Sequence, residues 1–183
     1  LTPAVTVTTA IEGLKGIGAL IANKNLQIKP LFYGGHQQNQ IRPGTYDAAL
    51  IVASSKALRI NYEKIDCYYH YVHKLYNYLI DKLIKLPFID INKKGDYYSP
   101  YVLSISLKKI KGETVMHYLE ENNIIVGIGS ACNEKSKTLE RSVFALTNSV
   151  EKSYNMIRIS LSHHNTYQEI DYLIEKLQEL GNR

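Results

Sequence analysis

The chain has 183 residues, 45% of them hydrophobic, enough for one domain or for one domain and part of another. Its formal net charge of +5 comes from basic residues that often stand beside acidic ones, which argues against a nucleic-acid-binding surface. Two distant cysteines without a CxxC pair, and no apolar run of about 18 residues, argue against a disulfide framework, a zinc finger and a membrane span. We therefore expect a protein of the reducing cytoplasm that binds no metal.

The first half of the chain is predicted to hold short strands, a polar loop and one long helix. Predicted strands lie at residues 1–10, 17–22 and 26–32. Because nothing precedes the first strand to pair with it, we expect the chain to be the C-terminal piece of a longer protein.

Residues 34–45 are polar and rich in glycine, which predicts a loop. Residues 47–86 contain no Gly or Pro and have apolar residues at helical spacing, which predicts one amphipathic helix with a break near 58–62.

The second half alternates strands and helices after a polar, turn-rich stretch at residues 89–100. Predicted strands lie at 101–107, 124–126 and 156–161, and predicted helices at 113–122 and 140–146. Thr166 and Glu169 form a capping-box pattern that marks the start of a last helix. This order of elements predicts an α/β fold with helices packed on a sheet, in a domain that starts near residue 86.

Cys132 is the first candidate for chemistry. It follows small residues at 129–131 and precedes a polar run with Lys135 and Lys137, so its thiol is expected to be exposed near cations that favour the reactive thiolate. An incidental surface cysteine explains the same pattern, and the residues alone leave both interpretations open. Cys67 lies in the long predicted helix, where we expect a packing role.

The polar loop and one strand supply two further candidates. The loop joins glycines to Arg42 and Thr45, which could both bind phosphate, although an ordinary surface turn has the same composition. Arg158 is a lone charge in an apolar strand and is either exposed to solvent or an anion ligand, since arginine suits bidentate carboxylate binding. His163 and His164 are expected on opposite faces of that strand, which argues against a shared metal ion.

Taken in order, these segments resemble the pyridoxal-phosphate (PLP) cysteine desulfurases of fold type I, the NifS-like branch of the class V aminotransferases. The similar segments are residues 15–20, 34–45, 100–106, 129–132, 158–161 and 166–171. The resemblance implies an α/β fold with the end of the large PLP domain at 1–46, a connecting helix at 47–86 and a small C-terminal domain with the cysteine loop at 87–183.

The resemblance also implies roles. Cys132 would take sulfur from L-cysteine as a persulfide and release alanine, while Arg158 would hold the substrate α-carboxylate. Thr45 would contact the phosphate of the partner subunit's PLP, which implies a homodimer. The loop after Cys132 is similar in length to the mobile loop of enzymes that deliver sulfur to an acceptor, such as an iron–sulfur scaffold or a thiolation enzyme.

One departure from the family is important. Thr9 and Ala10 stand where the resemblance expects a histidine and the lysine that forms the Schiff base with PLP, so this chain alone is expected to be inactive. An excised domain, an incomplete sequence of a longer chain and a natural relic each explain this. Two other functions stay open: a related class V lyase, such as a selenocysteine lyase or sulfinate desulfinase, and a non-catalytic domain that docks a partner.

Overall fold

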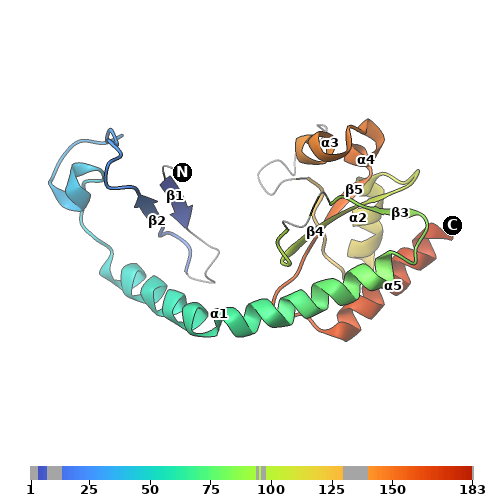
Figure 1. The fold of residues 1–183 in the computed structure, drawn as a ribbon. Helices are drawn as coiled ribbons and strands as arrows, with labels where there is room; N and C mark the ends of the chain where they lie inside the picture. The colour runs from blue at the N-terminus through green and yellow to red at the C-terminus, as the bar shows by residue number, and fades with distance from the viewer. Residues whose placement is uncertain (1–3, 8–13, 94, 96–97, 130–139, 183) are drawn as a thin grey trace. The chain divides into compact units, whose positions relative to one another are not determined.

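The computed structural model describes residues 4–7, 14–93, 95, 98–129 and 140–182. These residues belong to two compact units, Leu1–Ile65 and Asp66–Arg183, and the boundary between the units falls inside one long helix (Figure 1). Among the described residues, helices and strands are mixed, as the predicted α/β fold class requires. No helix in the described part of the chain is both long enough and apolar enough to cross a membrane.

The first unit contains a two-stranded sheet. Strand β1 (Ala4–Val7) pairs antiparallel with β2 (Ala19–Ala22), and Val5 lies opposite Ile21. The predicted strand at 26–32 is wrong, since these residues form no ladder. Pro30 within this segment has no amide hydrogen to donate to one. Residues 34–45 form the predicted loop, which contains the short 3₁₀ helix η2 (Gln37–Gln40).

Helix α1 (Ala48–Leu83) is continuous over 36 residues, so the predicted single helix is confirmed and the predicted break is wrong. Asp47 caps its start, because the Asp47 Oδ1 atom accepts a hydrogen bond from the Leu50 amide at 3.0 Å. The buried side chains all lie in the second half of the helix, at spacings of three and four residues: Val72, Leu75, Tyr76, Leu79 and Leu83. This second half therefore contributes one wall of a hydrophobic core.

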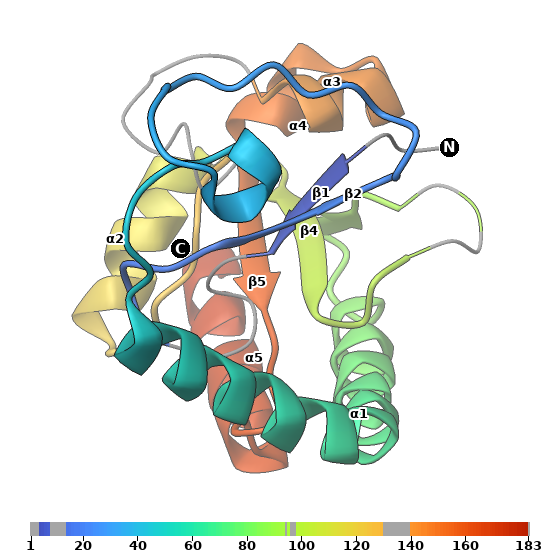
Figure 2. The ribbon, with the colours of Figure 1, turned by 90° about the vertical axis from the view of Figure 1, so that its left-hand side faces the viewer.

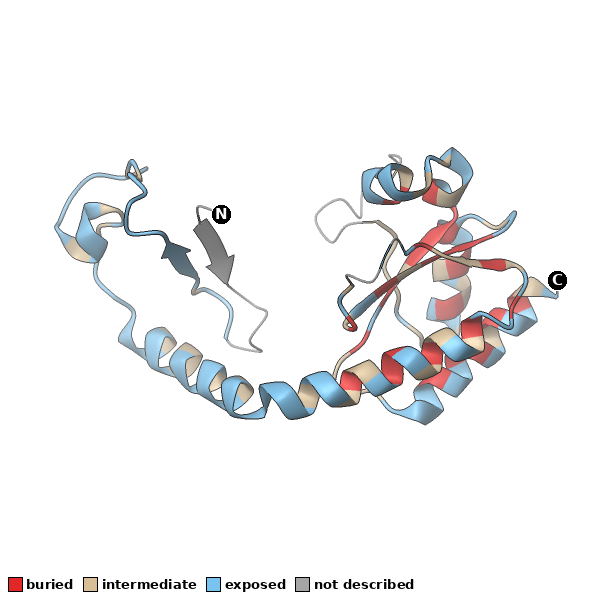
Figure 3. Ribbon diagram, in the orientation of Figure 1, coloured by how far each residue is buried: buried red, intermediate tan, exposed pale blue. Residues whose placement is uncertain are grey.

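The second unit is built on a three-stranded antiparallel sheet in the order β3-β4-β5. Its strands are β3 (Ile89–Ile91), β4 (Val102–Leu107) and β5 (Met156–Ser160). One face of this sheet is apolar and packs in a single core with α2 (Gly112–Glu121), α5 (Tyr167–Gly181) and the second half of α1 (Figure 3). Representative members of this core are Leu79, Ile105, Leu119, Ile157 and Leu177, all fully buried.

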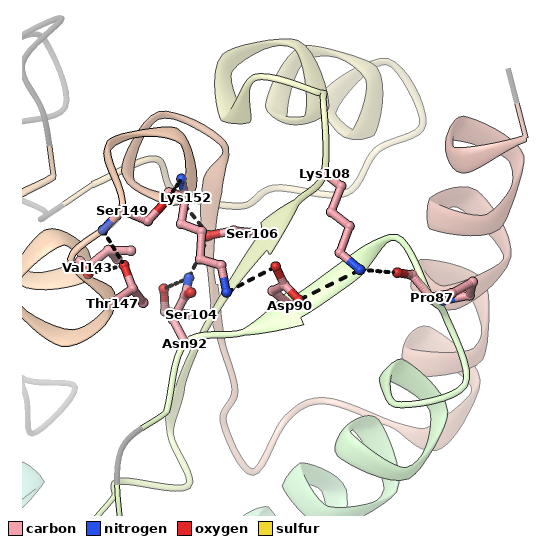
Figure 4. Close-up of polar contacts among 10 residues, drawn as sticks. All are labelled: Pro87, Asp90, Asn92, Ser104, Ser106, Lys108, Val143, Thr147, Ser149 and Lys152. Carbon is pink, nitrogen blue, oxygen red and sulfur yellow. Dashed lines mark hydrogen bonds and ion pairs between the residues drawn. The ribbon is translucent and has the colours of Figure 1, made fainter.

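The opposite face of the sheet is polar. Asn92 donates hydrogen bonds to the hydroxyls of Ser104 at 3.1 Å and Ser106 at 2.7 Å, and the Ser106 hydroxyl donates to the backbone carbonyl of Lys152 at 2.8 Å (Figure 4). The Lys152 ammonium pairs with Asp90 at 3.1 Å. These bonds hold helix α4 (Val150–Tyr154), together with α3 (Arg141–Thr147), against the sheet.

Most of the elements predicted for this unit are confirmed, and one predicted strand is wrong. The strands at 101–107 and 156–161 and the helices at 113–122 and 140–146 are confirmed within one or two residues. The capping box is also confirmed, since Thr166 Oγ1 accepts from the Glu169 amide and Glu169 Oε2 accepts from the Thr166 amide. The predicted strand at 124–126 is wrong, because this segment makes only an isolated bridge through Gly127. Strand β3 and helix α4 were not predicted.

Candidate functional site

Arg158 lies in the middle of β5, an edge strand of the second unit's three-stranded sheet. It stands in β5, which lies beside β4 (Figure 2), and its partner across that ladder is Ser104. On its other side its backbone exchanges two hydrogen bonds with Gly127, of 3.0 and 2.6 Å. Along this strand Ile157, Ile159 and Leu161 are buried, whereas Arg158 lies on the other face and is half-buried. A guanidinium placed there can bind an anion through two hydrogen bonds while the aliphatic part of the arginine side chain stays packed.

The guanidinium itself is anchored by backbone. Its Nη1 atom donates a hydrogen bond of 2.7 Å to the carbonyl oxygen of Gly129. Gly129 in turn donates its amide to the sulfur of Met156 at 3.2 Å and has φ +79°, a conformation that favours glycine. The end of the Arg158 side chain is therefore tied to a glycine backbone that is fixed to the same strand.

Cys132 lies in residues 130–139, outside the described residues, but both ends of that segment are described. Gly129, at one end, accepts the hydrogen bond from Arg158. Glu140, at the other end, places its Oε2 atom 2.9 Å from the position that a β-carbon on Gly129 would occupy. The Glu140 carboxylate also caps α3, accepting from the Ser142 amide at 3.4 Å. Gly129, which precedes this segment, is thus in contact with Arg158, and the carboxylate of Glu140, which follows it, lies close to Gly129.

Thr45 belongs to the first unit and lines a shallow hollow of about 290 Å³. The hollow is lined by Gly16, Ile17, Gly18, Gln38, Arg42, Pro43, Gly44, Thr45, Tyr46, Asp47, Leu50 and Ile51. Thr45 and Arg42 are both exposed, and Arg42 donates a hydrogen bond to the carbonyl oxygen of Pro43. A hydroxyl, a guanidinium and glycine backbone are donors suited to phosphate. The lining therefore fits the phosphate end of PLP; none of the residues that line it is a lysine, which the Schiff-base end requires.

Two other predictions at candidate residues are wrong. Cys67 is exposed on α1 and has no packing role. His163 and His164 do not point to opposite faces of a strand, because they lie in the turn after β5, where their ring centroids are 3.9 Å apart. The His163 ring stacks on Tyr68 at 3.6 Å, so this pair helps to hold the turn against α1. Thr9 and Ala10 lie outside the described residues.

Sequence reasoning overlooked the residues around Arg158. Ser104, Gly127 and Gly129 are its immediate neighbours in the structure, yet nothing in the sequence connected them with Arg158. The alternation of β4 indicated that Ser104 faces away from the core, and this was the available signal for one of them. The position of Gly127 depends on a bridge between segments 31 residues apart in sequence, which periodicity cannot reveal.

Comparison with known proteins identifies relatives over nearly the whole chain. The family model for aminotransferase class-V matches residues 10–173. The chain is 32% identical over 169 residues to a probable mitochondrial cysteine desulfurase of Schizosaccharomyces pombe, covering 91% of this chain and 33% of that protein. It is 27% identical over 169 residues to the cysteine desulfurase IscS of Dictyoglomus turgidum, covering 92% of this chain and 43% of the relative. The chain thus spans less than half the length of either relative.

Solved structures of NifS-like proteins superpose on nearly the whole of this chain. A NifS-like protein superposes with a TM-score of 0.81 and 27% identity, covering 97% of this chain and 45% of that chain. The NifS-like protein from Rickettsia africae superposes with a TM-score of 0.84 and 28% identity, covering 99% of this chain and 48% of that chain. The predicted fold, that of a fold-type I NifS-like protein, is therefore confirmed.

Proposed function

Because the chain belongs to the aminotransferase class-V family, we propose that it is the C-terminal part of a cysteine desulfurase in which Cys132 receives the sulfur of L-cysteine. The observation that carries this proposal is the position of Arg158. Its guanidinium is bonded to Gly129, the last described residue before the segment with Cys132, and the carboxylate of Glu140, the first described residue after it, lies close to Gly129. A guanidinium in contact with the residue that precedes the cysteine segment supports what a desulfurase needs, namely a carboxylate anchor near a sulfur acceptor.

The chemistry assigned to Cys132 is a sulfur transfer. The thiolate of Cys132 attacks the sulfur of the bound cysteine, and an S–S bond forms as the substrate Cβ–S bond breaks. The electron pair of that bond stays on carbon, which takes up a proton, so that the products are a persulfide on Cys132 and alanine. PLP, when bound, supplies the electron sink that makes the Cβ–S bond weak enough to break.

Arg158 acts on the carboxylate of the substrate. Its guanidinium can hold the two carboxylate oxygens through parallel N–H bonds, which fixes the substrate orientation as well as its position. Because Arg158 is half-buried on the sheet and tied to Gly129, its geometry is set before the substrate arrives. Such preorganisation lowers the entropic cost of bringing the thiol and the substrate together.

Thr45 acts on the cofactor. We assign its hydroxyl, with Arg42 and the neighbouring glycine backbone, to the phosphate of the PLP bound by a second subunit, so that the active protein is a homodimer. The composition of the hollow around Thr45 supports this role. Since Thr9 and Ala10 stand in place of the expected histidine and lysine, this chain alone does not form the Schiff base, and in the full-length protein a lysine from outside these 183 residues has to form it.

The sulfur on Cys132 then passes to an acceptor protein, such as an iron–sulfur scaffold or a thiolation enzyme. A thiol-based relay needs a reducing compartment, since an oxidising one would trap Cys132 in a disulfide. We therefore assign the reaction to the cytoplasm.

The decisive experiment compares two cysteine variants in the full-length protein that contains this chain. With PLP and L-cysteine supplied, Cys132→Ser should abolish the protein-bound persulfide and the release of alanine. Cys67→Ser is the matched control, because Cys67 is exposed on α1 and has no assigned role. Persulfide and alanine formation that survives Cys132→Ser at the wild-type rate would contradict the proposed function.

A further inference from the structure

Arg158 has small residues on both sides. Ser104 lies opposite it on β4, and Gly127 lies opposite it on the segment that follows α2. Residues directly opposite each other on antiparallel strands have side chains close enough to touch, so a larger residue at either position would compete with Arg158 for space. Of the two neighbours, only Gly127 lacks a side chain altogether.

The guanidinium occupies the space that a side chain at position 127 would fill. A β-carbon built on Gly127 would stand 2.9 Å from Arg158 Nη2, 3.2 Å from Cζ and 3.4 Å from Nε. The distances to Nη2 and Cζ are shorter than ordinary contacts, so the guanidinium would have to move. Arg158 Nη1 meanwhile donates to Gly129, two residues further along the same segment.

We infer that Gly127 is a positioning residue for substrate binding: its missing side chain lets the Arg158 guanidinium lie flat on the backbone between residues 127 and 129. This inference rests on the proposed role of Arg158 as the carboxylate ligand. A methyl group at position 127 pushes the guanidinium away from Gly129. The substrate carboxylate then binds to a displaced or mobile guanidinium. A displacement of about 1 Å at such a site costs up to about a hundredfold in efficiency.

The first test observes Arg158 without cofactor or substrate. The chain has five arginines, so isotope-labelled arginine gives a simple NMR spectrum of Nε–H groups, in which Arg158→Lys identifies the Arg158 signal. In the wild type this signal should be shifted from the free-arginine position and protected from exchange with water. In Gly127→Ala it should move toward the free-arginine position. An unchanged Arg158 signal in Gly127→Ala would overturn the inference.

Ser104→Ala is the control for general loss of stability. It removes the hydroxyl that accepts a hydrogen bond from Asn92, without adding bulk beside Arg158. It should lower the melting temperature while leaving the Arg158 signal in place. A shift of that signal as large as the one in Gly127→Ala would show that the signal reports stability rather than position, and would also overturn the inference.

The second test measures the kinetics of the full-length holoenzyme in a double-mutant cycle. Gly127→Ala should raise the KM for L-cysteine by about tenfold to a hundredfold, with a smaller effect on kcat. In the Arg158→Lys background the same substitution should change KM less than twofold, because lysine has no guanidinium to displace. An equal cost in both backgrounds refutes the positioning role of Gly127. An unchanged KM in Arg158→Lys alone refutes instead the proposed carboxylate role of Arg158.

Discussion

Ser106 gives the sharpest prediction about the polar face of the sheet. It is 2% exposed, and its hydroxyl makes two hydrogen bonds, accepting from Asn92 at 2.7 Å and donating to the Lys152 carbonyl at 2.8 Å. Ser106→Ala removes both bonds and leaves no room for water to replace the hydroxyl fully. A buried partner that loses its hydrogen bond costs about 1–3 kcal/mol. Asn92 keeps its bond to Ser104, so we expect a total loss of about 2–3 kcal/mol.

The assay is urea unfolding of the chain, followed by the fluorescence of its 15 tyrosines, with the free energy obtained by linear extrapolation. Ser160→Ala is the matched control, because Ser160 is exposed at the end of β5 and should change the free energy of unfolding by less than about 0.5 kcal/mol. A loss in Ser106→Ala no larger than that of the control would show that the bonds to Asn92 and Lys152 do not hold α4 on the sheet.

Four further predictions concern the core, two polar contacts of α5 and the cofactor. Leu177→Ala should cost about 2–5 kcal/mol in urea unfolding because Leu177 is fully buried, whereas exposed Gln178→Ala should have little effect. Thr166→Ala should cost about 1 kcal/mol in the same assay, since it breaks the capping box of α5, and no loss would show that the cap is dispensable. Hydrogen bonds from Lys82 and Tyr78 lower the pKa of Asp171 in the folded protein. The stability that Asp171 contributes is therefore present above its unfolded-state pKa of about 4 and is lost as pH falls through the lower folded-state pKa. The melting temperature of Asp171→Asn should depend less on pH in that acidic range than the melting temperature of the wild type. The chain alone, mixed with PLP and dialysed, should retain no visible cofactor absorbance. In a separate assay of the full-length protein, turnover of selenocysteine but not of cysteine would favour a selenocysteine lyase over a cysteine desulfurase.

The elements that the sequence predicted correctly carry their own local signals. Helix α5 has a capping box and an apolar stripe, and α1 has helical spacing without Gly or Pro. Strand β4 alternates Leu103, Ile105 and Leu107 with serines, so its two faces could be assigned before the structure was known. In these elements local preference and tertiary packing agree, which is why pattern reading succeeds.

The errors in strand prediction share one physical cause, which is that the pairing partners lie far away in the chain. Residues 26–32 are as apolar as a strand but find no ladder among the described residues, while three-residue β3 forms because β4 offers it an edge. The site follows the same rule. Arg158 was singled out as a charge among apolar residues, but its contact with Gly127 exists only because the two backbones bridge.

The bond between Arg158 and Gly129 also couples two segments that lie far apart in sequence. Arg158 Nη1 donates to the Gly129 carbonyl and the Gly129 amide donates to the Met156 sulfur, so both polar groups of this glycine are bonded to side chains of β5. A substitution that displaces the Arg158 guanidinium therefore frees one of these two groups, and the backbone at residue 129 loses part of its attachment to the sheet.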